Sequence, residues 1–481
     1  MRWATASRPS SIIVLQASRR CKRATSQSLA PGGTLGKLGI ICPAMPSYFI
    51  WTLGCQMNKA DSERLAGNLE ALGLAPASEV DAADVVVVNS CAVRQTAEDR
   101  VVGKMGYLKG LRRRRPDLLV ALTGCMVGAN AADLRQRLPF VDFFLPPLQW
   151  GPLLAAVRDR AGAAPVARGP ENAGCGAATL HLPAGQDAPA RWVPIIYGCD
   201  NFCTYCIVPF RRGRERSRPL DEIVAEVEGV VAQGAREVTL LGQNVDSYGH
   251  DLPGRPDLAE LLARADAVPG LARVRFLTSH PKDMSERLID AVASLPKVCE
   301  HINLPVQAGD DRILAAMRRG YTAAAYRALV ERIRARVPAV ALSTDLIVGF
   351  PSETREEFRR SYDLLAEIRF DVVHAAMYSP RPGTAASRLA DDVPADEKRE
   401  RLQMVEELQE RIACERNRAL VGDEVEVLVE RRSKGKWEGR TRTDKLVFFA
   451  DAGDWRGGLA TVRITRASAW SLQGEVVGGP R

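Results

Sequence analysis

Residues 197–218 read YGCDNFCTYCIVPFRRGRERSR and place Cys199, Cys203 and Cys206 within eight positions. A structural zinc site has four protein ligands, and a disulfide framework uses even numbers of cysteines along a short chain. The next cysteine is Cys299, so no fourth thiol is near in sequence. The three thiols therefore favour an iron-sulfur cluster with one open iron, with a zinc site or unrelated buried thiols as the alternatives.

Length and composition limit what the protein can be. The chain has 481 residues, of which 46% are hydrophobic, enough for two or three domains with buried cores. No apolar run reaches about 18 residues, which predicts no membrane-spanning helix. Eleven cysteines without a secretory segment indicate metal-binding thiols in a reducing compartment, so we expect a cytoplasmic protein.

The net charge of +8 is unevenly distributed. Seven basic and no acidic residues lie in 1–45, which leaves +1 for the rest, so only local clusters inform about partners. Residues 1–45 are rich in Ser and Arg, as targeting peptides are. We favour a disordered extension or a start site assigned too far upstream, because Met45 immediately precedes sequence that looks folded.

Residues 46–165 alternate apolar runs with helical stretches, which predicts parallel strands in a doubly wound α/β domain. The runs YFIWTLG, DVVVVNS and LLVALTG end directly before Cys55, Cys91 and Cys125. Because the carboxyl ends of parallel strands share one sheet edge, these three cysteines are expected to converge. The alternative is three small buried thiols without a ligand.

Two further folded regions follow a linker at 166–190, rich in Ala, Gly and Pro. In 191–395, six strand candidates alternate with helices, and six βα units argue for an open, partial (β/α)6 barrel rather than a closed one of eight. Cys199, Cys203 and Cys206 follow its first strand, at the face where barrel active sites lie. Residues 396–418 are predicted to form a connecting helix.

Residues 419–481 are strand-rich and predict a small β-barrel. Within 431–445 there are seven basic and two acidic residues around one tryptophan, a pattern that suits RNA backbone contact with base stacking. The candidate RNA-binding residues are Arg431, Arg432, Lys434, Lys436, Trp437, Arg440 and Arg442. The alternative is a solvated charged hairpin.

Several of these motifs resemble known families. Cys199-x-x-x-Cys203-x-x-Cys206, with Tyr205 before the last cysteine, resembles the signature of radical S-adenosylmethionine (SAM) enzymes. TLGCQMNKADSE, VNSCAVRQTAEDR and LTGCMV resemble the amino-terminal domain of the methylthiotransferases, and GRTRTDKLVFF resembles the RNA-binding TRAM domain. The resemblance covers residues from about 46 to 478.

The resemblance implies two [4Fe-4S] clusters and SAM as cofactors. Cys199, Cys203 and Cys206 would hold the cluster that binds SAM, and Cys55, Cys91 and Cys125 an auxiliary cluster that holds the sulfur to be inserted. No side chain is expected to act as acid or base, because the chemistry takes place at the clusters. The expected SAM contacts are Tyr205, Gly242, Gln243 and Asp345.

Local strings such as GCQMN, FCTYCIVPF, LLGQNVDSYG and TSHPKDM favour the members that act on isopentenyladenosine beside the anticodon of tRNA. The implied reaction adds a methylthio group at C2 of N6-dimethylallyladenosine and uses two SAM molecules. The expected partners are tRNA and an electron-donor protein, with the enzyme a monomer. The alternatives are a sister enzyme acting on threonylcarbamoyl-adenosine or a ribosomal protein, and a non-catalytic iron-sulfur protein that binds RNA.

Other positions leave the interpretation open. Ser352, Ala308 and Asp310 stand where the family resemblance leads us to expect Gly, Ser and Ser, near the expected SAM contacts. After the cysteine loop come five arginines: Arg211, Arg212, Arg214, Arg216 and Arg218. These arginines either bind phosphates or the SAM carboxylate, or form a solvated charged loop.

Overall fold

The computed structural model describes residues 46–92, 95–128, 131–161 and 188–479. The predicted extension at 1–45 and all but the end of the predicted linker at 166–190 lie outside the described residues. No helix in the described part of the chain is long and apolar enough to span a membrane.

The amino-terminal domain is a five-stranded parallel sheet with the order β2-β1-β3-β4-β5. Its strands are β1 (Ser47–Thr52), β2 (Ala75–Pro76), β3 (Val85–Ser90), β4 (Leu119–Gly124) and β5 (Phe143–Leu145). Its helices are α1 (Gln56–Ala71), α2 (Gln95–Arg114), α3 (Ala132–Arg137) and α4 (Gly151–Ala161), with a 3-10 turn, η1, at Val80–Ala82. This strand order confirms a doubly wound sheet, in which the strand order reverses between β1 and β3.

Both faces of this sheet are covered. One face of β3 and β4 packs against α2 through residues such as Val86, Val120 and Leu108. The opposite face packs against α1 and α4, where Leu69 and Leu153 belong to a second hydrophobic cluster. Continuous runs of valine and leucine form these strands because their side chains are buried on both sides.

The central region confirms the partial (β/α)6 barrel. Its six parallel strands form two sheets, β10-β9-β6 and β11-β12-β13. A parallel bridge between Val274 and Val298 joins the sheets. The strands are β6 (Ala190–Pro194), β9 (Glu237–Leu241), β10 (Arg273–Leu277), β11 (His301–Asn303), β12 (Ala341–Val348) and β13 (Val372–Met377). One hydrophobic cluster runs from Val193 on the first strand to Phe370 before the last, so the six units share a single core.

Helices alternate with these strands. They are α5 (Val208–Arg212), α6 (Leu220–Ala232), α7 (Leu258–Asp266), α8 (Glu286–Ser294), α9 (Asp311–Ala316), α10 (Ala323–Arg336), α11 (Arg355–Ile368) and α12 (Ala395–Arg418). Two 3-10 turns, η2 (Val245–Ser247) and η3 (Ala386–Arg388), and a short antiparallel pair, β7 (Ile196–Tyr197) with β8 (Arg216–Ser217), complete the region. The predicted connector is therefore the long helix α12.

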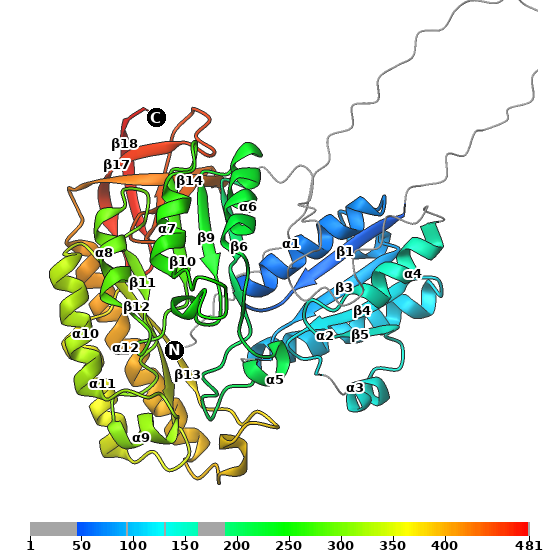
Figure 1. Ribbon diagram of the computed structural model, residues 1–481, viewed down its shortest axis with the longest axis horizontal. Coiled ribbons are helices and arrows are strands. Elements are labelled where there is room, and N and C mark those ends of the chain that lie inside the picture. Colours follow the sequence, from blue (N-terminus) through cyan, green and yellow to red (C-terminus); the bar gives the residue numbers. More distant parts are fainter. Residues whose placement is uncertain (1–45, 93–94, 129–130, 162–187, 480–481) are drawn as a thin grey trace, which may run out of the picture.

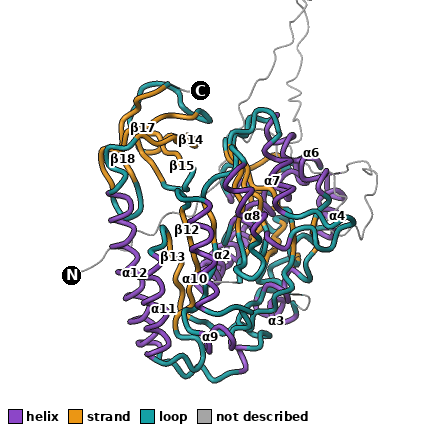
Figure 2. The backbone as a smooth tube through the Cα atoms, turned by 60° about the vertical axis from the view of Figure 1, so that its left-hand side comes forward, coloured by secondary structure: helices purple, strands orange, loops and turns teal. Residues whose placement is uncertain are grey.

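The carboxyl-terminal domain is a closed five-stranded barrel, β14-β15-β16-β18-β17. Its strands are β14 (Glu424–Ser433), β15 (Lys436–Thr441), β16 (Leu446–Phe449), β17 (Leu459–Ala467) and β18 (Leu472–Gly478). In Figures 1 and 2 this domain caps one end of the central barrel, while α9 lies at the other. Arg273, the first residue of β10, donates to the Arg440 carbonyl at 2.7 Å, so the capped end holds the amino ends of the strands.

The amino-terminal domain is fastened to the first barrel strands through α1. Met57 and Ala60 pack against Tyr197 and Leu241, and Figure 1 shows α1 beside β6. Two buried ion pairs cross the same boundary. Arg64 lies 3.0 Å from Glu226 Oε2, and Arg212 Nη2 lies 2.8 Å from Asp61 Oδ2.

Candidate functional site

Cys199, Cys203 and Cys206, called the core cysteines below, lie in the loop after β7, at the carboxyl end of the first barrel strand. The Cys199 N–H donates to the Gly213 carbonyl at 3.2 Å. Thr204 fastens the loop to the end of α9, since its N–H donates to Met317 O at 3.1 Å and its hydroxyl to Ala316 O at 2.8 Å. The first bond closes the loop on its own segment, and the other two fix it to the barrel rim at α9.

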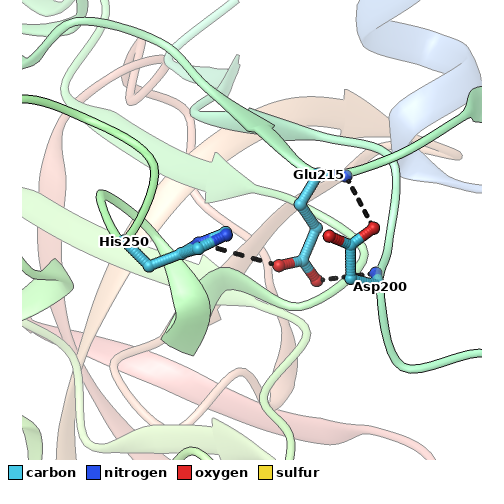
Figure 3. A group of neighbouring side chains, drawn as sticks. All are labelled: Asp200, Glu215 and His250. Carbon is cyan, nitrogen blue, oxygen red and sulfur yellow. Dashed lines mark hydrogen bonds and ion pairs between the residues drawn. The ribbon is translucent and has the colours of Figure 1, made fainter.

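Asp200, which lies within this loop, forms a polar group with Glu215 and His250 (Figure 3). The Asp200 N–H donates to Glu215 Oε1 and the Glu215 N–H donates to Asp200 Oδ1, both at 3.1 Å. Arg214 adds two hydrogen bonds to the Asp200 carboxylate, at 2.6 and 3.1 Å. The His250 Nδ1 lies 2.8 Å from the Ser247 carbonyl. The group thus holds the cysteine loop onto β8.

The core thiols lie in a poorly solvated environment. Burial raises the pKa of Cys199 to about 11 and that of Cys206 to about 12. Such thiols become thiolates at neutral pH only when a metal supplies the positive charge. Arg319, which is also buried, donates to Cys203 Sγ at 3.4 Å, to Pro305 O and to the Tyr321 hydroxyl. The thiols and this donor together suit a metal centre rather than reactive free cysteines.

The four predicted SAM contacts lie on or near the barrel rim. Asp345 lies on β12, with Asn303 Nδ2 at 3.4 Å from its Oδ2. Gly242 and the half-buried Gln243 follow β9. A Cβ on Gly242 would come within 2.5 Å of the Ile196 side chain, so close packing already requires glycine there. Tyr205 packs against the apolar cluster that contains Ile313 and Met317. The SAM contacts themselves remain predictions.

Cys55, Cys91 and Cys125, called the N-terminal cysteines below, follow β1, β3 and β4 at one sheet edge. A Cβ on Gly54 would lie 2.7 Å from the Cys91 Cβ, and one on Gly124 would lie 2.3 Å from the Ser90 carbonyl. Both glycines have positive φ, of 147° and 93°. The chain can therefore turn from β1 into Cys55 and from β4 into Cys125 only with glycine at these two positions. Cys91 and Cys125 are buried, and Cys55 is exposed.

Buried amides support the N-terminal cysteines. Asn58 Nδ2 donates to Asn89 Oδ1 at 3.0 Å and to the Ser90 carbonyl at 2.8 Å. The Cys55 thiol lies 3.5 Å from Asn58 Oδ1. Burial raises the pKa of Cys125, and the nearby positive charge of Arg212 opposes that rise. The sequence pattern identified the three cysteines but gave no sign of this supporting network.

The two cysteine sets are joined by the segment that follows Cys206. Ile207 packs against Cys125 and Ala92. A Cβ on Gly128 would lie 1.8 Å from Arg211 Nη1, so this guanidinium lies directly on the loop after Cys125. The segment that follows the core cysteines in sequence therefore packs against the N-terminal cysteines.

The five arginines after the cysteine loop do not share one role. Arg214 and Arg216 are exposed, as expected for a solvated loop. Arg212 and Arg218 are buried, so the solvated-loop interpretation is wrong for these two. Arg218 donates to Glu226 at 2.6 Å and to the Pro194 carbonyl at 2.7 Å, and Arg212 contacts α1. The spacing of these arginines does not distinguish the buried from the exposed ones.

The predicted RNA-binding residues divide into two groups. Arg431, Arg432, Lys434 and Lys436 are exposed around the β14–β15 turn. Trp437 is only 6% exposed and packs in the barrel core, and its indole N–H donates to Gly453 O. The structure therefore corrects the expectation that its ring stacks on RNA bases.

Arg440 and Arg442 are also engaged within the protein. Arg440 pairs with Asp444 at 3.1 Å. Arg442 pairs with Glu300 at 2.7 Å and donates to the Val298 carbonyl, which fastens the carboxyl-terminal domain to the central barrel. For Arg442 the expectation of RNA contact is likewise corrected, because its guanidinium is used in docking.

Comparisons with known proteins agree with this division into three parts. The Radical SAM superfamily matches residues 193–365, the uncharacterized protein family UPF0004 matches residues 47–146, and the TRAM domain matches residues 418–477. The match boundaries lie close to those of the amino-terminal domain, the central barrel and the carboxyl-terminal barrel.

Curated relatives are similar over most of the chain. The tRNA-2-methylthio-N(6)-dimethylallyladenosine synthase of Dehalococcoides mccartyi is 50% identical over 437 residues, which is 90% of this chain and 99% of the relative. The synthase of the same name from Herpetosiphon aurantiacus is 50% identical over 90% of this chain and 97% of its own. That of Chloroflexus aurantiacus is 51% identical over 90% of this chain and 92% of its own.

Among solved structures, the radical S-adenosylmethionine methyltransferase TsrM from Kitasatospora setae, bound to tryptophan and a SAM analogue, has a TM-score of 0.52. It is 16% identical and covers 68% of this chain and 72% of its own. A second structure of the same protein, with cobalamin and a [4Fe-4S] cluster bound, has a TM-score of 0.50 at 17% identity, with 68% of this chain and 70% of its own covered. These likenesses show a common fold.

Proposed function

The chain belongs to the family of radical SAM tRNA-2-methylthio-N(6)-dimethylallyladenosine synthases, and we propose that the core cysteines and the N-terminal cysteines each hold one [4Fe-4S] cluster. It is a tRNA methylthiotransferase, which adds a methylthio group to dimethylallyladenosine in tRNA. The observation that carries the two-cluster proposal is the pair of three-cysteine sets, each at the carboxyl end of parallel strands and joined through Ile207.

The residues present fit cubane clusters better than single zinc ions. A tetrahedral zinc with Zn–S distances of about 2.3 Å would bring its thiolates to about 3.8 Å from one another. Within the described ranges, the only group of three or more candidate ligand atoms that all lie within 4.8 Å is Asp200, Glu215 and His250, so neither cysteine set is that compact. Wider spacing suits the larger cluster, and three thiolates would leave one iron open in each.

The two clusters, when bound, supply the electron that cleaves SAM and the sulfur that is inserted. The surrounding side chains do the rest. Arg319 donates to the Cys203 sulfur, and Tyr321 holds that guanidinium in place with its hydroxyl 2.9 Å from Nε. The buried apolar cluster under Tyr205 excludes water from the side of the cysteine loop that faces α9. Asp345, Gly242 and Gln243 remain the proposed SAM contacts.

The carboxyl-terminal barrel supports binding of the tRNA substrate. Exposed Arg431, Arg432, Lys434 and Lys436 surround the turn between β14 and β15 and offer positive charge to RNA phosphates. Arg432 is partly held by Trp437, since its guanidinium lies 5.6 Å from the indole ring centroid. The proposed chemistry also requires an electron-donor protein.

Iron analysis and product analysis together test the proposal. After anaerobic reconstitution we expect about eight irons per chain, and about four when the core or the N-terminal cysteines are replaced by alanine. With SAM, a reductant and tRNA that contains dimethylallyladenosine, the enzyme should form 5′-deoxyadenosine and the mass of an added methylthio group. About four irons in the unmodified protein would refute the two-cluster model.

A further inference from the structure

Arg212 belongs to the central barrel, but its guanidinium lies among the N-terminal cysteines. It is the last residue of α5, six positions after Cys206, and its side chain is 3% exposed. Its Nη2 donates to Asp61 Oδ2 at 2.8 Å and lies 3.4 Å from Asn58 Oδ1, and both partners belong to α1, which starts after Cys55. The guanidinium also lies close enough to Cys55 and Cys125 for its charge to act on both thiols.

One end of this guanidinium has no partner within the described protein. Arg212 Nη1 is buried and makes no hydrogen bond there, and the same holds for Asp61 Oδ1. Leaving a buried donor on a charged group unsatisfied is unfavourable, so such groups usually face a ligand or an ordered water. The orphaned nitrogen lies beside two thiols of a proposed cluster, where a sulfur acceptor would satisfy it.

The alternative role of Arg212 is that of an ion pair that only joins two domains. Arg64 provides the comparison, because it pairs with Glu226 across the same boundary at 3.0 Å. Arg64 differs in its neighbours. Its Nη1 hydrogen-bonds to the Tyr197 hydroxyl, and the main influences on its pKa include no cysteine. Of these two arginines, Arg212 alone combines the interdomain pair with an unsatisfied nitrogen and two neighbouring thiols.

We propose that Arg212 is a hydrogen-bond donor to the sulfur of the auxiliary cluster, through its free Nη1, and thereby helps to hold sulfide at the open iron. This inference rests on the proposed function, which assigns that cluster to Cys55, Cys91 and Cys125. A three-thiolate cluster with added sulfide carries excess negative charge, and N–H donors to such sulfurs stabilise the more negative state. The donor comes from the segment after Cys206, so the SAM-binding barrel itself completes the sulfur site.

The test uses the full chain with the core cysteines replaced by alanine, so that only the auxiliary cluster is present. Iron content, the midpoint potential of the cluster and its dissociation constant for inorganic sulfide are measured in this parent and in added variants. In Arg212→Met we expect a more negative midpoint potential and about a tenfold weaker sulfide affinity, equivalent to about 1.4 kcal/mol. Arg212→Lys should recover part of both, and Arg64→Met should change neither.

A second variant tests the direction of the electrostatic effect on midpoint potential and sulfide affinity, without removing the arginine. Asp61→Asn keeps the side-chain shape but removes the negative charge that Arg212 now neutralises, so the potential should rise and sulfide should bind more tightly. A purely structural pair predicts loss of stability in Arg212→Met, Asp61→Asn and Arg64→Met, with unchanged potential and sulfide affinity. That result would overturn the inference.

The remaining outcomes are also decisive. A parent that loads no cluster refutes the two-cluster proposal itself, and the Arg212 inference falls with it. A parent that loads a cluster, with an Arg212→Met variant that matches it in both measurements, refutes only the role of Arg212. Loss of the cluster in Arg212→Met, with retention in Arg212→Lys and Arg64→Met, supports it, because those variants separate the charge from the fold.

Discussion

Asn58 on α1 and Asn89 on β3 are joined by a buried hydrogen bond of 3.0 Å from Nδ2 to Oδ1, and Asn89 Nδ2 returns a bond of 2.8 Å to the Asn58 carbonyl. These residues lie three positions after Cys55 and two before Cys91, so the pair sets the distance between two N-terminal cysteines. Asn89→Ala should reduce the free energy of unfolding by roughly 1–3 kcal/mol and lower iron retention toward about four per chain. Urea unfolding and iron analysis measure both effects.

Asn68→Ala is the matched control for that substitution. Asn68 lies on the same helix, is half-buried and donates to the Arg64 carbonyl at 3.0 Å. We expect a change within about 0.5 kcal/mol and a full iron content. Equal iron loss in both variants would show that the amide pair has no special role in placing the cysteines.

Gly124→Ala should disrupt the turn into Cys125. The new methyl group would lie 2.3 Å from the Ser90 carbonyl, on a backbone with φ of 93°. We expect the free energy of unfolding to fall by at least about 2 kcal/mol. We also expect the loss of one cluster, seen as a decrease in the absorbance of the iron-sulfur clusters. Gly103→Ala on α2, where nothing lies within 4 Å, should instead stabilise by up to about 1 kcal/mol. A tolerated Gly124→Ala would contradict the predicted steric conflict.

Ser352 occupies a backbone conformation that favours glycine, with φ of 66°. Ser352→Gly should therefore stabilise the central barrel by about 0.5–1 kcal/mol, offset in part by loss of the hydroxyl that accepts from Arg312 at 3.1 Å. Ser352→Ala keeps the Cβ and removes the same hydroxyl, so it should show no gain. Thermal unfolding of the wild type, Ser352→Gly and Ser352→Ala at equal iron content measures these differences in stability.

His280 should make stability depend on pH. Burial, followed by the charges of Arg319 and Lys282, lowers its pKa from 6.5 to about 2. The folded state therefore keeps His280 neutral while the unfolded state takes up a proton below pH 6.5, so stability falls as pH falls. Between pH 7.5 and 5.5 this one group contributes a loss of about 1.4 kcal/mol at most.

The comparison for this prediction is His280→Gln, studied by urea unfolding at both pH values. The variant should lose less stability than the wild type on acidification. The difference between the two proteins is needed because burial raises the pKa of Asp246 to about 7, and that carboxyl titrates in the same range with the opposite sign. An equal pH dependence in both proteins would rule out a contribution from His280.

Lys434 and Lys436, exposed at the β14–β15 turn, should contribute to tRNA affinity by neutralising phosphates. Replacing both by alanine should weaken binding and reduce the slope of log affinity against log salt by about 0.7–0.9 for each phosphate that is no longer neutralised. Arg442→Ala should leave that slope unchanged and instead destabilise the docked barrel, since Arg442 pairs with Glu300. An unchanged slope in the double lysine variant would show that the RNA-binding surface lies elsewhere on the protein.

The sequence predicted the position of the cysteines better than it predicted which residues are exposed on the surface. Each N-terminal cysteine follows a continuous apolar run, and that local pattern was enough to place Cys55, Cys91 and Cys125 at one sheet edge. Charge and aromatic content, by contrast, do not say which way a strand residue faces. Lys436 and Trp437 are neighbours in sequence, yet one is exposed and the other buried, because successive side chains of a strand point to opposite faces and Trp437 points into the barrel core.

Longer-range contacts were beyond any local pattern. Arg442 faces outward from its own barrel, but that outer surface lies on Glu300 and Val298 of the central barrel. Arg212 belongs to the same arginine run as exposed Arg214, and only the packing of two domains determines which of them is buried. The burial and contacts of such residues depend on how the domains, each predictable by itself, pack against one another.

The two ion pairs between α1 and the central barrel have a consequence for motion. Arg64 with Glu226 and Arg212 with Asp61 place four charged side chains at one seam, each no more than 13% exposed. Pulling the domains apart would break both pairs and would also expose the apolar contact of Met57 and Ala60 with Tyr197 and Leu241 to water. These contacts oppose separation of the two domains. We therefore expect the two cysteine sets to stay together while successive SAM molecules are exchanged.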